Sequence, residues 1–140
     1  TSLRQLAKRQ TESGGVPVRA LLSPACASCA SNNAVQMYCI AREAVANATR
    51  HAQASEIVVS LDCLHGGFVN LTIIDDGVGC KAAARGRGGL GLKIMAYRAQ
   101  MVGGSLKIED GEAGGTRVVC SIPCKPQGMP LSEWPASRSE

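Results

Sequence analysis

The sequence predicts a two-layer α/β sandwich in which a mixed sheet is covered on one face by about three helices. Helix-like and strand-like segments follow one another in the order α-β-α-β-β-α-β-β, with a long loop before the third helix. This order lacks the strict βαβ alternation of a doubly wound parallel sheet, and paired strands beside a few helices favour the sandwich. The length of 140 residues suits one domain with a single hydrophobic core.

The chain begins with a predicted helix and a predicted strand. Residues 2–11 carry leucine and alanine at helical spacing, and the turn residues ESGG follow them. Residues 16–22 alternate weakly between apolar and polar side chains, as a half-buried strand does. A loop rich in small and polar residues then leads to the next element.

The most strongly helical segment runs from about residue 33 to residue 51. Asn32 or Asn33 can cap its start, because a side-chain oxygen there accepts a hydrogen bond from a free backbone N–H. Apolar residues recur along the segment at the spacing of one buried helix face. They are Val35, Met37, Tyr38, Ile40, Ala41, Ala44, Val45 and Ala48.

A hairpin follows the long helix. Residues 55–64 and 68–74 are rich in β-branched and other apolar residues, and the glycine turn HGG joins them, which is typical of two antiparallel strands. Residues 75–91 then form a polar, glycine-rich loop. A loop of this length inside a compact domain is usually functional or mobile.

The last elements are one helix and two strands. The helix is expected from residue 91 to about residue 101, and a glycine pair after it is a typical helix stop. The strands are expected over residues 105–110 and 117–123. From residue 125 onward prolines and polar residues predict a flexible tail. We therefore expect a domain over residues 1–124 and a tail over residues 125–140.

Composition and charge argue against several classes of protein. The net charge is only +4 and basic residues are scattered, while aromatic residues make up 3%, so nucleic acid is not an expected partner. No apolar run approaches the ~20 residues of a membrane span. The start of the chain is polar and basic, unlike a signal peptide, and it lacks an initiator methionine. We interpret the chain as a cytoplasmic piece of a longer protein, without membrane contact of its own.

The seven cysteines leave a metal site open as an alternative. An odd count without a secretory signal favours reduced thiols. Cys26 and Cys29 form a C-x-x-C pair, and Cys120 and Cys124 form a C-x-x-x-C pair, so four thiolates could hold zinc. Cys120, however, lies inside the apolar run VVCSI, as a small core residue does.

A glycine cluster, GRGGLG at residues 86–91, matches the G-x-G-x-x-G pattern of dinucleotide-binding loops. Those loops follow directly after a buried strand, whereas the residues here before the cluster are polar and alanine-rich. A phosphate site at the start of the following helix fits better, because free backbone N–H groups and the positive end of the helix dipole favour an anion. Arg85, Arg87 and Lys93 could add positive charge.

The long helix carries a polar face beside its apolar one. Glu43 and Asn47 are four residues apart, and Arg50 and His51 follow three and four residues later. A carboxylate and an amide oxygen are hard donors that suit Mg²⁺. The simpler interpretation is a solvated helix face with an ion pair.

Two acidic residues follow the second strand of the hairpin. Asp75 and Asp76 end an apolar run, and Gly77 and Gly79 come next. A carboxylate at a buried strand end needs hydrogen-bond donors, and the exocyclic amine of a purine is one such donor. The glycines would let a flat base approach the backbone. An ordinary Asp-Gly turn is the alternative.

These motifs together resemble a known family. REAVANATRHA, DDGVG and GGLGL, followed by GGT at residues 114–116, closely resemble the ATP-binding catalytic domain of two-component sensor histidine kinases. The likeness is nearest to the nitrate-sensor and thermosensor-like subfamily, and the wider group holds the gyrase, Hsp90 and MutL ATPase domains. It covers roughly residues 3–123. The resemblance implies a Bergerat-type α/β sandwich.

The resemblance also implies a role for each motif. Asn47 would ligate Mg²⁺, and Glu43 would support the metal or polarise a nucleophile. Arg50 and His51 would lie near the phosphates. Asp75 would accept a hydrogen bond from the adenine amine. Residues implied to shape the base pocket or the nucleotide lid are Gly77, Gly79, Arg87, Gly89, Leu90, Gly91, Leu92 and Thr116, of which Thr116 would assist Asp75 through water.

The implied activity is that of an ATP-dependent protein-histidine kinase using ATP and Mg²⁺. Such kinases carry the phosphoacceptor histidine on a dimerisation domain, and the two histidines here, His51 and His65, do not resemble it. The resemblance therefore implies that this domain lies outside the chain, in a homodimeric parent protein that passes the phosphoryl group to a response regulator. A membrane anchor in the parent is left open. A GHKL-type ATPase or an anti-sigma-factor serine kinase is the alternative.

Overall fold

The computed structural model describes residues 2–13, 15–23, 31–52, 54–64, 68–77, 90–111 and 114–123. The elements run in the predicted order. They are α1 (Ser2–Glu12), β1 (Val18–Leu22), α2 (Ser31–Asn47), the π-helical turn η2 (Ala48–Ala52), β2 (Ile57–Leu64), β3 (Phe68–Asp75), α4 (Leu90–Met101), β4 (Ser105–Asp110) and β5 (Thr116–Pro123). The predicted tail from residue 125 lies outside the described residues, so the domain boundary stays a prediction.

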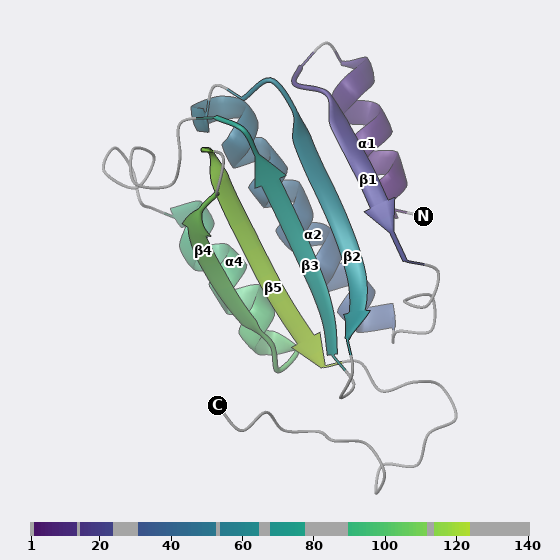
Figure 1. The fold of residues 1–140 in the computed structure, drawn as a ribbon. Helices are drawn as coiled ribbons and strands as arrows, with labels where there is room; N and C mark the ends of the chain where they lie inside the picture. The colour runs from purple at the N-terminus through teal and green to yellow at the C-terminus, as the bar shows by residue number, and fades with distance from the viewer. Residues whose placement is uncertain are drawn as a thin grey trace, which may run out of the picture.

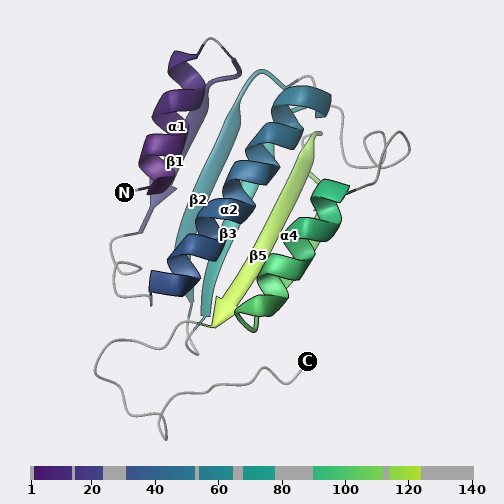
Figure 2. The ribbon, with the colours of Figure 1, turned by 180° about the vertical axis from the view of Figure 1, so that it is seen from behind.

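The strands form one mixed sheet in the order β1-β2-β3-β5-β4. β1 pairs with β2 in parallel, and the other three pairings are antiparallel. The predicted hairpin is confirmed, because Leu64 of β2 pairs with Phe68 of β3 next to the turn. Figures 1 and 2 show α1, α2 and α4 side by side on one face of the sheet. The two-layer sandwich is therefore confirmed, and it differs from the parallel sheet of a dinucleotide fold.

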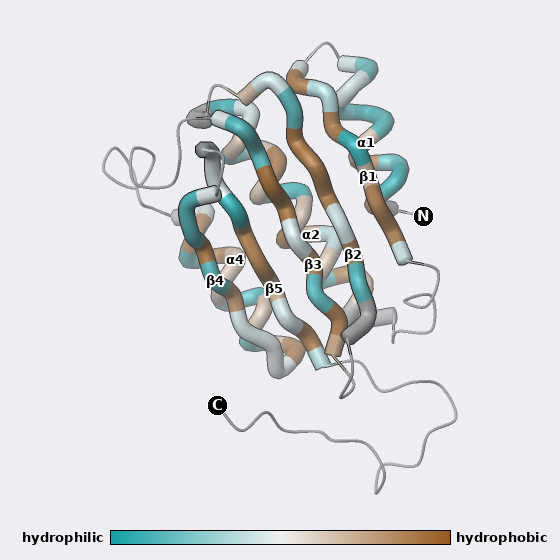
Figure 3. Tube along the Cα trace, viewed as in Figure 1, coloured by the Kyte–Doolittle hydropathy of each residue, from teal (hydrophilic) through white to brown (hydrophobic). Residues whose placement is uncertain are grey.

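The core lies between the sheet and the helices. Successive strand residues point to opposite faces, and on β3 the buried Val69, Leu71 and Ile73 share the face that α2 covers. Figure 3 shows hydrophobic residues in the middle of β2 and β5, whereas most of α1 is hydrophilic. The largest fully buried side chains come from the sheet and both larger helices. They are Ile40, Ile57, Leu71, Ile73, Met95, Ile122, Val45, Val59, Val69 and Cys120.

The apolar face predicted for the long helix is correct with one exception. Met37, Ile40, Ala44 and the other members toward the end of α2 are buried, but Val35 is 57% exposed. Val35 stands two positions before Met37, which rotates its side chain by about 200° around an α-helix. The prediction placed it on the wrong side of the helix for that reason.

The C-terminal ends of α2 and α4 have different backbone structures. The predicted helix over residues 33–51 is α-helical only to Asn47, and the residues after it form the π turn η2. The glycine stop after α4 is confirmed. Gly103 adopts a φ of 76°, its N–H donates to Gln100 at 3.0 Å, and the N–H of Gly104 donates to Ala99 at 2.8 Å. This is a Schellman ending, which uses the free carbonyls of the last turn.

Cys120 is a core residue, as predicted. Its side chain has no exposed surface, and burial raises the pKa of its thiol to about 12, so it stays protonated at neutral pH. Cys26, Cys29 and Cys124 lie outside the described residues. Within the described ranges no group of three or more His, Cys, Asp or Glu side chains could hold a metal ion. None of the helices described has the length and apolar character needed to cross a membrane.

Candidate functional site

The site lies where β3 and α2 end at the same edge of the two layers. Figure 1 shows the end of β3 and the turn η2, which follows α2, at the same edge of the two layers. Asp75 is the last residue of β3, and by strand alternation from Ile73 it belongs to the helix-covered face. Asn47 is the last α-helical residue of α2. The chain therefore brings the acidic strand end and the polar helix end together at one edge.

Asp75 is a buried carboxylate with only 6% of its surface exposed. Oδ1 accepts hydrogen bonds from the backbone N–H of Gly77 at 2.8 Å and of Thr116 at 3.3 Å. Burial raises the pKa of Asp75, the two N–H donors partly offset this, and the nearby Asp76 charge adds to the rise. Among the described residues, these hydrogen bonds reach Oδ1 and not Oδ2. A further donor on Oδ2 would therefore relieve part of the cost of burying this charge.

The glycine pair before β5 makes the second of these hydrogen bonds possible. Gly115 is buried, has a φ of 82°, and lies against the backbone of Asp75. A Cβ at Gly115 would meet the carbonyl oxygen of Asp75 in a clash with backbone atoms. Only glycine allows this approach, which brings the N–H of Thr116 to the Asp75 carboxylate. The predicted water-mediated role of the Thr116 side chain stays a prediction.

The polar face of α2 forms a second cluster. Arg50 donates from Nη2 to Oδ1 of Asn47 at 2.9 Å, and the same nitrogen lies 3.8 Å from Oε2 of Glu43. The Arg50 side chain is 55% exposed and that of Glu43 is 31% exposed, so this pair adds little to stability. The cluster shows that the two oxygens converge on one cation. An amide and a carboxylate oxygen that already share a cation suit Mg²⁺, which prefers hard oxygen ligands.

Gly91, in the first turn of α4, closes this cluster from the other side. A Cβ at Gly91 would lie 2.5 Å from Oε2 of Glu43 and 3.2 Å from Nδ2 of Asn47. The start of α4 therefore packs directly on the polar face of α2. The free N–H groups of a helix start, next to two possible metal ligands, form a suitable place for phosphate oxygens.

The Gly91→Ala variant should keep its stability but displace the Glu43 and Asn47 side chains, so any effect of Mg²⁺ on nucleotide binding at these oxygens should fall. Alanine favours an α-helix over glycine by about 1 kcal/mol, which opposes the steric cost. The atoms it would meet are ends of flexible side chains, so Glu43 and Asn47 would move rather than the backbone. Urea unfolding and calorimetric ATP titration with and without Mg²⁺ check both parts. An unchanged effect of Mg²⁺ on ATP affinity would contradict the expectation.

Several predicted site residues cannot be compared with the structure. The backbone of His51 lies in η2 and that of Leu90 begins α4, but their side chains are not described. Leu92 is half-buried and packs against the core. Gly79, Arg87 and Gly89 lie outside the described residues.

Two residues at the site were missed by sequence reasoning. Asp76 was considered only as part of an acidic pair, although it makes contacts of a different kind from those of Asp75. Gly115 was considered only as part of the GGT motif, without a role of its own. The signal for Gly115 was the glycine pair directly before a strand, which is a common site of positive φ.

Comparison with known proteins identifies the domain. Residues 32–126 match the family described as histidine kinase-, DNA gyrase B-, and HSP90-like ATPase. The chain belongs to this ATPase family. The match includes α2 from Asn32 onward, the end of β3, the start of α4 and the glycine pair before β5, which together make up the site described above.

Individual proteins similar to this chain belong to one branch of the family, the sensor kinases. The nitrate/nitrite sensor protein NarX of Escherichia coli K12 is 40% identical over 92 residues, which cover 66% of this chain and 15% of that protein. The nitrate/nitrite sensor protein NarQ of the same strain is 41% identical over 88 residues, which cover 63% of this chain and 16% of that protein. The ATP-binding domain of PrrB from Mycobacterium tuberculosis has 25% identity and a TM-score of 0.68, covering 89% of this chain and 92% of that one.

These likenesses make the chain the ATP-binding catalytic domain of a two-component sensor histidine kinase. The chain spans only 15% and 16% of the length of the two nitrate/nitrite sensor proteins.

Proposed function

We propose that this ATPase-family domain binds ATP together with Mg²⁺ and donates the γ-phosphoryl group to a histidine on a dimerisation domain outside this chain. A response regulator then receives the phosphoryl group on an aspartate. The proposal is supported chiefly by the buried Asp75 carboxylate at the same edge as the Asn47 and Glu43 oxygens. This arrangement offers one acceptor for a base and a separate group of oxygens for a metal.

The base-binding half depends on Asp75. Its Oδ1 is held by two backbone N–H groups, which fix the orientation of the carboxylate. The exocyclic amine of adenine would donate to Oδ2. A hydrogen bond to a charged group contributes about 1.5–3 kcal/mol, which is enough to select a base that carries a donor at this position.

The phosphate-binding half depends on α2 and the start of α4. Asn47 and Glu43 would hold Mg²⁺, whose charge would help to neutralise the triphosphate, as phosphoryl transfer requires. Arg50 already lies beside both oxygens and is exposed, so its guanidinium can turn toward the phosphates when a metal replaces it. The first N–H groups of α4 would orient phosphate oxygens.

The Asn47→Ala variant should lose most of the Mg²⁺ dependence of ATP binding while keeping its affinity for metal-free ATP. Alanine removes the amide oxygen that would ligate the metal but leaves Asp75 untouched. Calorimetric titration with ATP, in Mg²⁺ and in EDTA, measures the difference. Asn70→Ala is the matched control, because Asn70 is on the helix-free face of β3. An equal loss of Mg²⁺ dependence in both variants would contradict the assignment.

The identity of the phosphoacceptor can be tested by preparing this domain and the dimerisation domain as separate proteins. ATP labelled at the γ-phosphate should leave this domain unlabelled by itself and should label an added dimerisation domain from the parent protein. The label should be lost in acid, because phosphohistidine is acid-labile and phosphoserine is not. An acid-stable label on a serine would instead favour the anti-sigma-factor kinase, and phosphate release without any label would favour a simple ATPase.

A further inference from the structure

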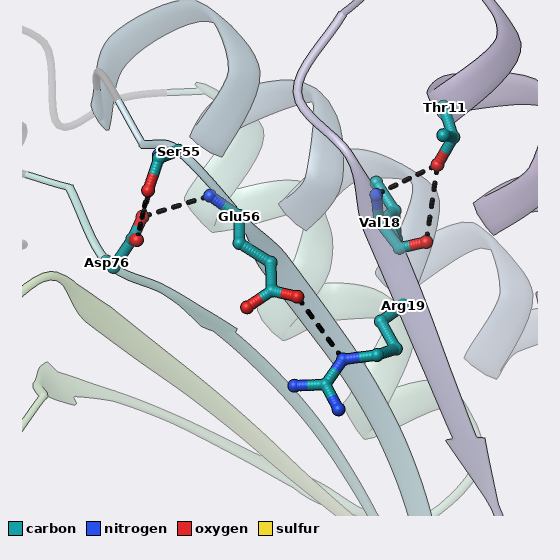
Figure 4. A network of polar contacts seen from close by, with 6 residues as sticks. All are labelled: Thr11, Val18, Arg19, Ser55, Glu56 and Asp76. Atoms are coloured by element: carbon teal, nitrogen blue, oxygen red, sulfur yellow. Dashed lines mark hydrogen bonds and ion pairs between the residues drawn. The ribbon is translucent and has the colours of Figure 1, made fainter.

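Asp76 follows Asp75 directly but lies in different surroundings. It is exposed, and its carboxylate makes three hydrogen bonds to Ser55 and Glu56, which Figure 4 shows beside it. Oδ1 accepts from the backbone N–H of Ser55 at 2.8 Å and of Glu56 at 3.1 Å. Oδ2 accepts from the Ser55 hydroxyl at 2.5 Å. These contacts lower the pKa of Asp76, with the Ser55 hydroxyl as the largest cause.

The segment that Asp76 holds is the connection between the two halves of the nucleotide site. The turn η2 ends at Ala52, β2 begins at Ile57, and Ser55 and Glu56 lie between them. Ile57 pairs with Asp75 at the end of the β2–β3 ladder. Beyond this pair, the Asp76 side chain takes the place of strand pairing and ties the connection to the tip of β3.

We propose that Asp76 is a positioning residue that sets the spacing between the base-binding Asp75 and the metal-binding end of α2. Asp75 is its neighbour on one side, and the connection it holds leads directly back to η2 and Asn47 on the other. This inference rests on the proposed function of those two residues. Asp76 itself does not touch the nucleotide in this arrangement.

The role requires oxygen acceptors rather than charge. Asparagine at position 76 can still accept from both backbone N–H groups through Oδ1, and its amide can donate to the Ser55 hydroxyl oxygen. Alanine can do neither. The salt bridge between Arg19 and Glu56, 3.2 Å long and largely exposed, extends the contacts toward β1 but adds little energy (Figure 4).

The test compares Asp76→Ala with Asp76→Asn. Asp76→Ala should speed amide hydrogen exchange at Ser55 and Glu56 and weaken Mg-ATP binding by about tenfold, since small misplacements of a binding group have effects of this order or larger. Adenosine, which needs only the base-binding half, should be affected less. Asp76→Asn should stay close to wild type in both measurements. Calorimetry gives the ratio of the Mg-ATP and adenosine affinities, which reports the spacing.

The outcomes separate this role from simple stabilisation and from the proposed function. If Asp76→Ala lowers the melting temperature but keeps the wild-type ratio of affinities, the positioning role is wrong. If wild-type domain fails to bind ATP, the proposed function is wrong instead. Should Asp76→Ala not fold, Ser55→Ala removes only the contact to Oδ2 and should shift the ratio in the same direction. An unchanged ratio in that variant would likewise overturn the inference.

Discussion

Replacement of Asp75 by asparagine should weaken ATP binding by about 10- to 100-fold, the equivalent of losing a hydrogen bond to a charged acceptor. The new side chain could still accept from Gly77 and Thr116 through its amide oxygen, so the local backbone should hold. Its amide nitrogen, however, would face the adenine amine as a second donor. The loss should be equal for ATP and for adenosine, because it concerns only the base. Calorimetric titration with both ligands measures it.

The same variant should be more stable than wild type without ligand. Burial raises the pKa of Asp75, so the stability that this group contributes is fully present below its ordinary pKa and is lost as pH rises through the raised value. Asparagine carries no charge and escapes this loss. The difference in melting temperature between Asp75→Asn and wild type should therefore grow from acid toward neutral pH. Asp76→Asn is the matched control, and equal ATP affinities in all three proteins would contradict the assignment of Asp75.

Replacement of Gly115 by alanine should have the largest effect on stability. A Cβ there would overlap the carbonyl oxygen of Asp75 and lie 2.7 Å from its carbonyl carbon, so the backbone of β3 or of the turn must move. The φ of 82° adds about 1–2 kcal/mol of strain for any residue with a Cβ. We expect a total loss of more than about 3 kcal/mol in the free energy of unfolding, the range of severe backbone and packing changes.

Gly114 provides the control for this prediction. It also has a positive φ, of 97°, but a Cβ there would meet no atom within 4 Å. Gly114→Ala should therefore show the conformational strain alone, about 1–2 kcal/mol. Urea unfolding of the two variants gives the difference, and ATP titration of whatever fraction stays folded reports the displaced Asp75. Equal destabilisation by the two substitutions would contradict the close approach of Gly115 to β3.

The sequence was sufficient for the features that depend on local periodicity. The alternation of the hairpin strands and the apolar run before Asp75 predicted both the pairing and the place of that carboxylate. The spacing of Glu43, Asn47 and Arg50 predicted a shared polar face, and Arg50 does contact both oxygens.

Features that depend on distant contacts were not predictable in this way. Asp76 and Ser55 are 21 residues apart, and no periodic pattern connects the end of one strand with the segment before another. The approach of Gly115 to Asp75 spans an even longer separation. The π turn after Asn47 interrupts a segment whose composition still favours a helix, and Val35 fits an apolar pattern that the actual orientation of α2 leaves in solvent. For Asp76 and Gly115 tertiary packing decided between locally acceptable arrangements, whereas the exposure of Val35 follows from its place two residues before Met37 on the helix.

The parallel pairing of β1 has a consequence for how the domain opens. β1 lies at the rim of the sheet and, among the strands described, pairs only with β2. Thr11 of α1 hydrogen-bonds to both the N–H and the carbonyl of Val18. The amino-terminal helix and its strand are thus joined to each other and can detach as one cooperative unit. Such sub-global opening would leave the β2–β3–β5–β4 ladder whole, so the first twenty or so residues should exchange their amide protons before the rest.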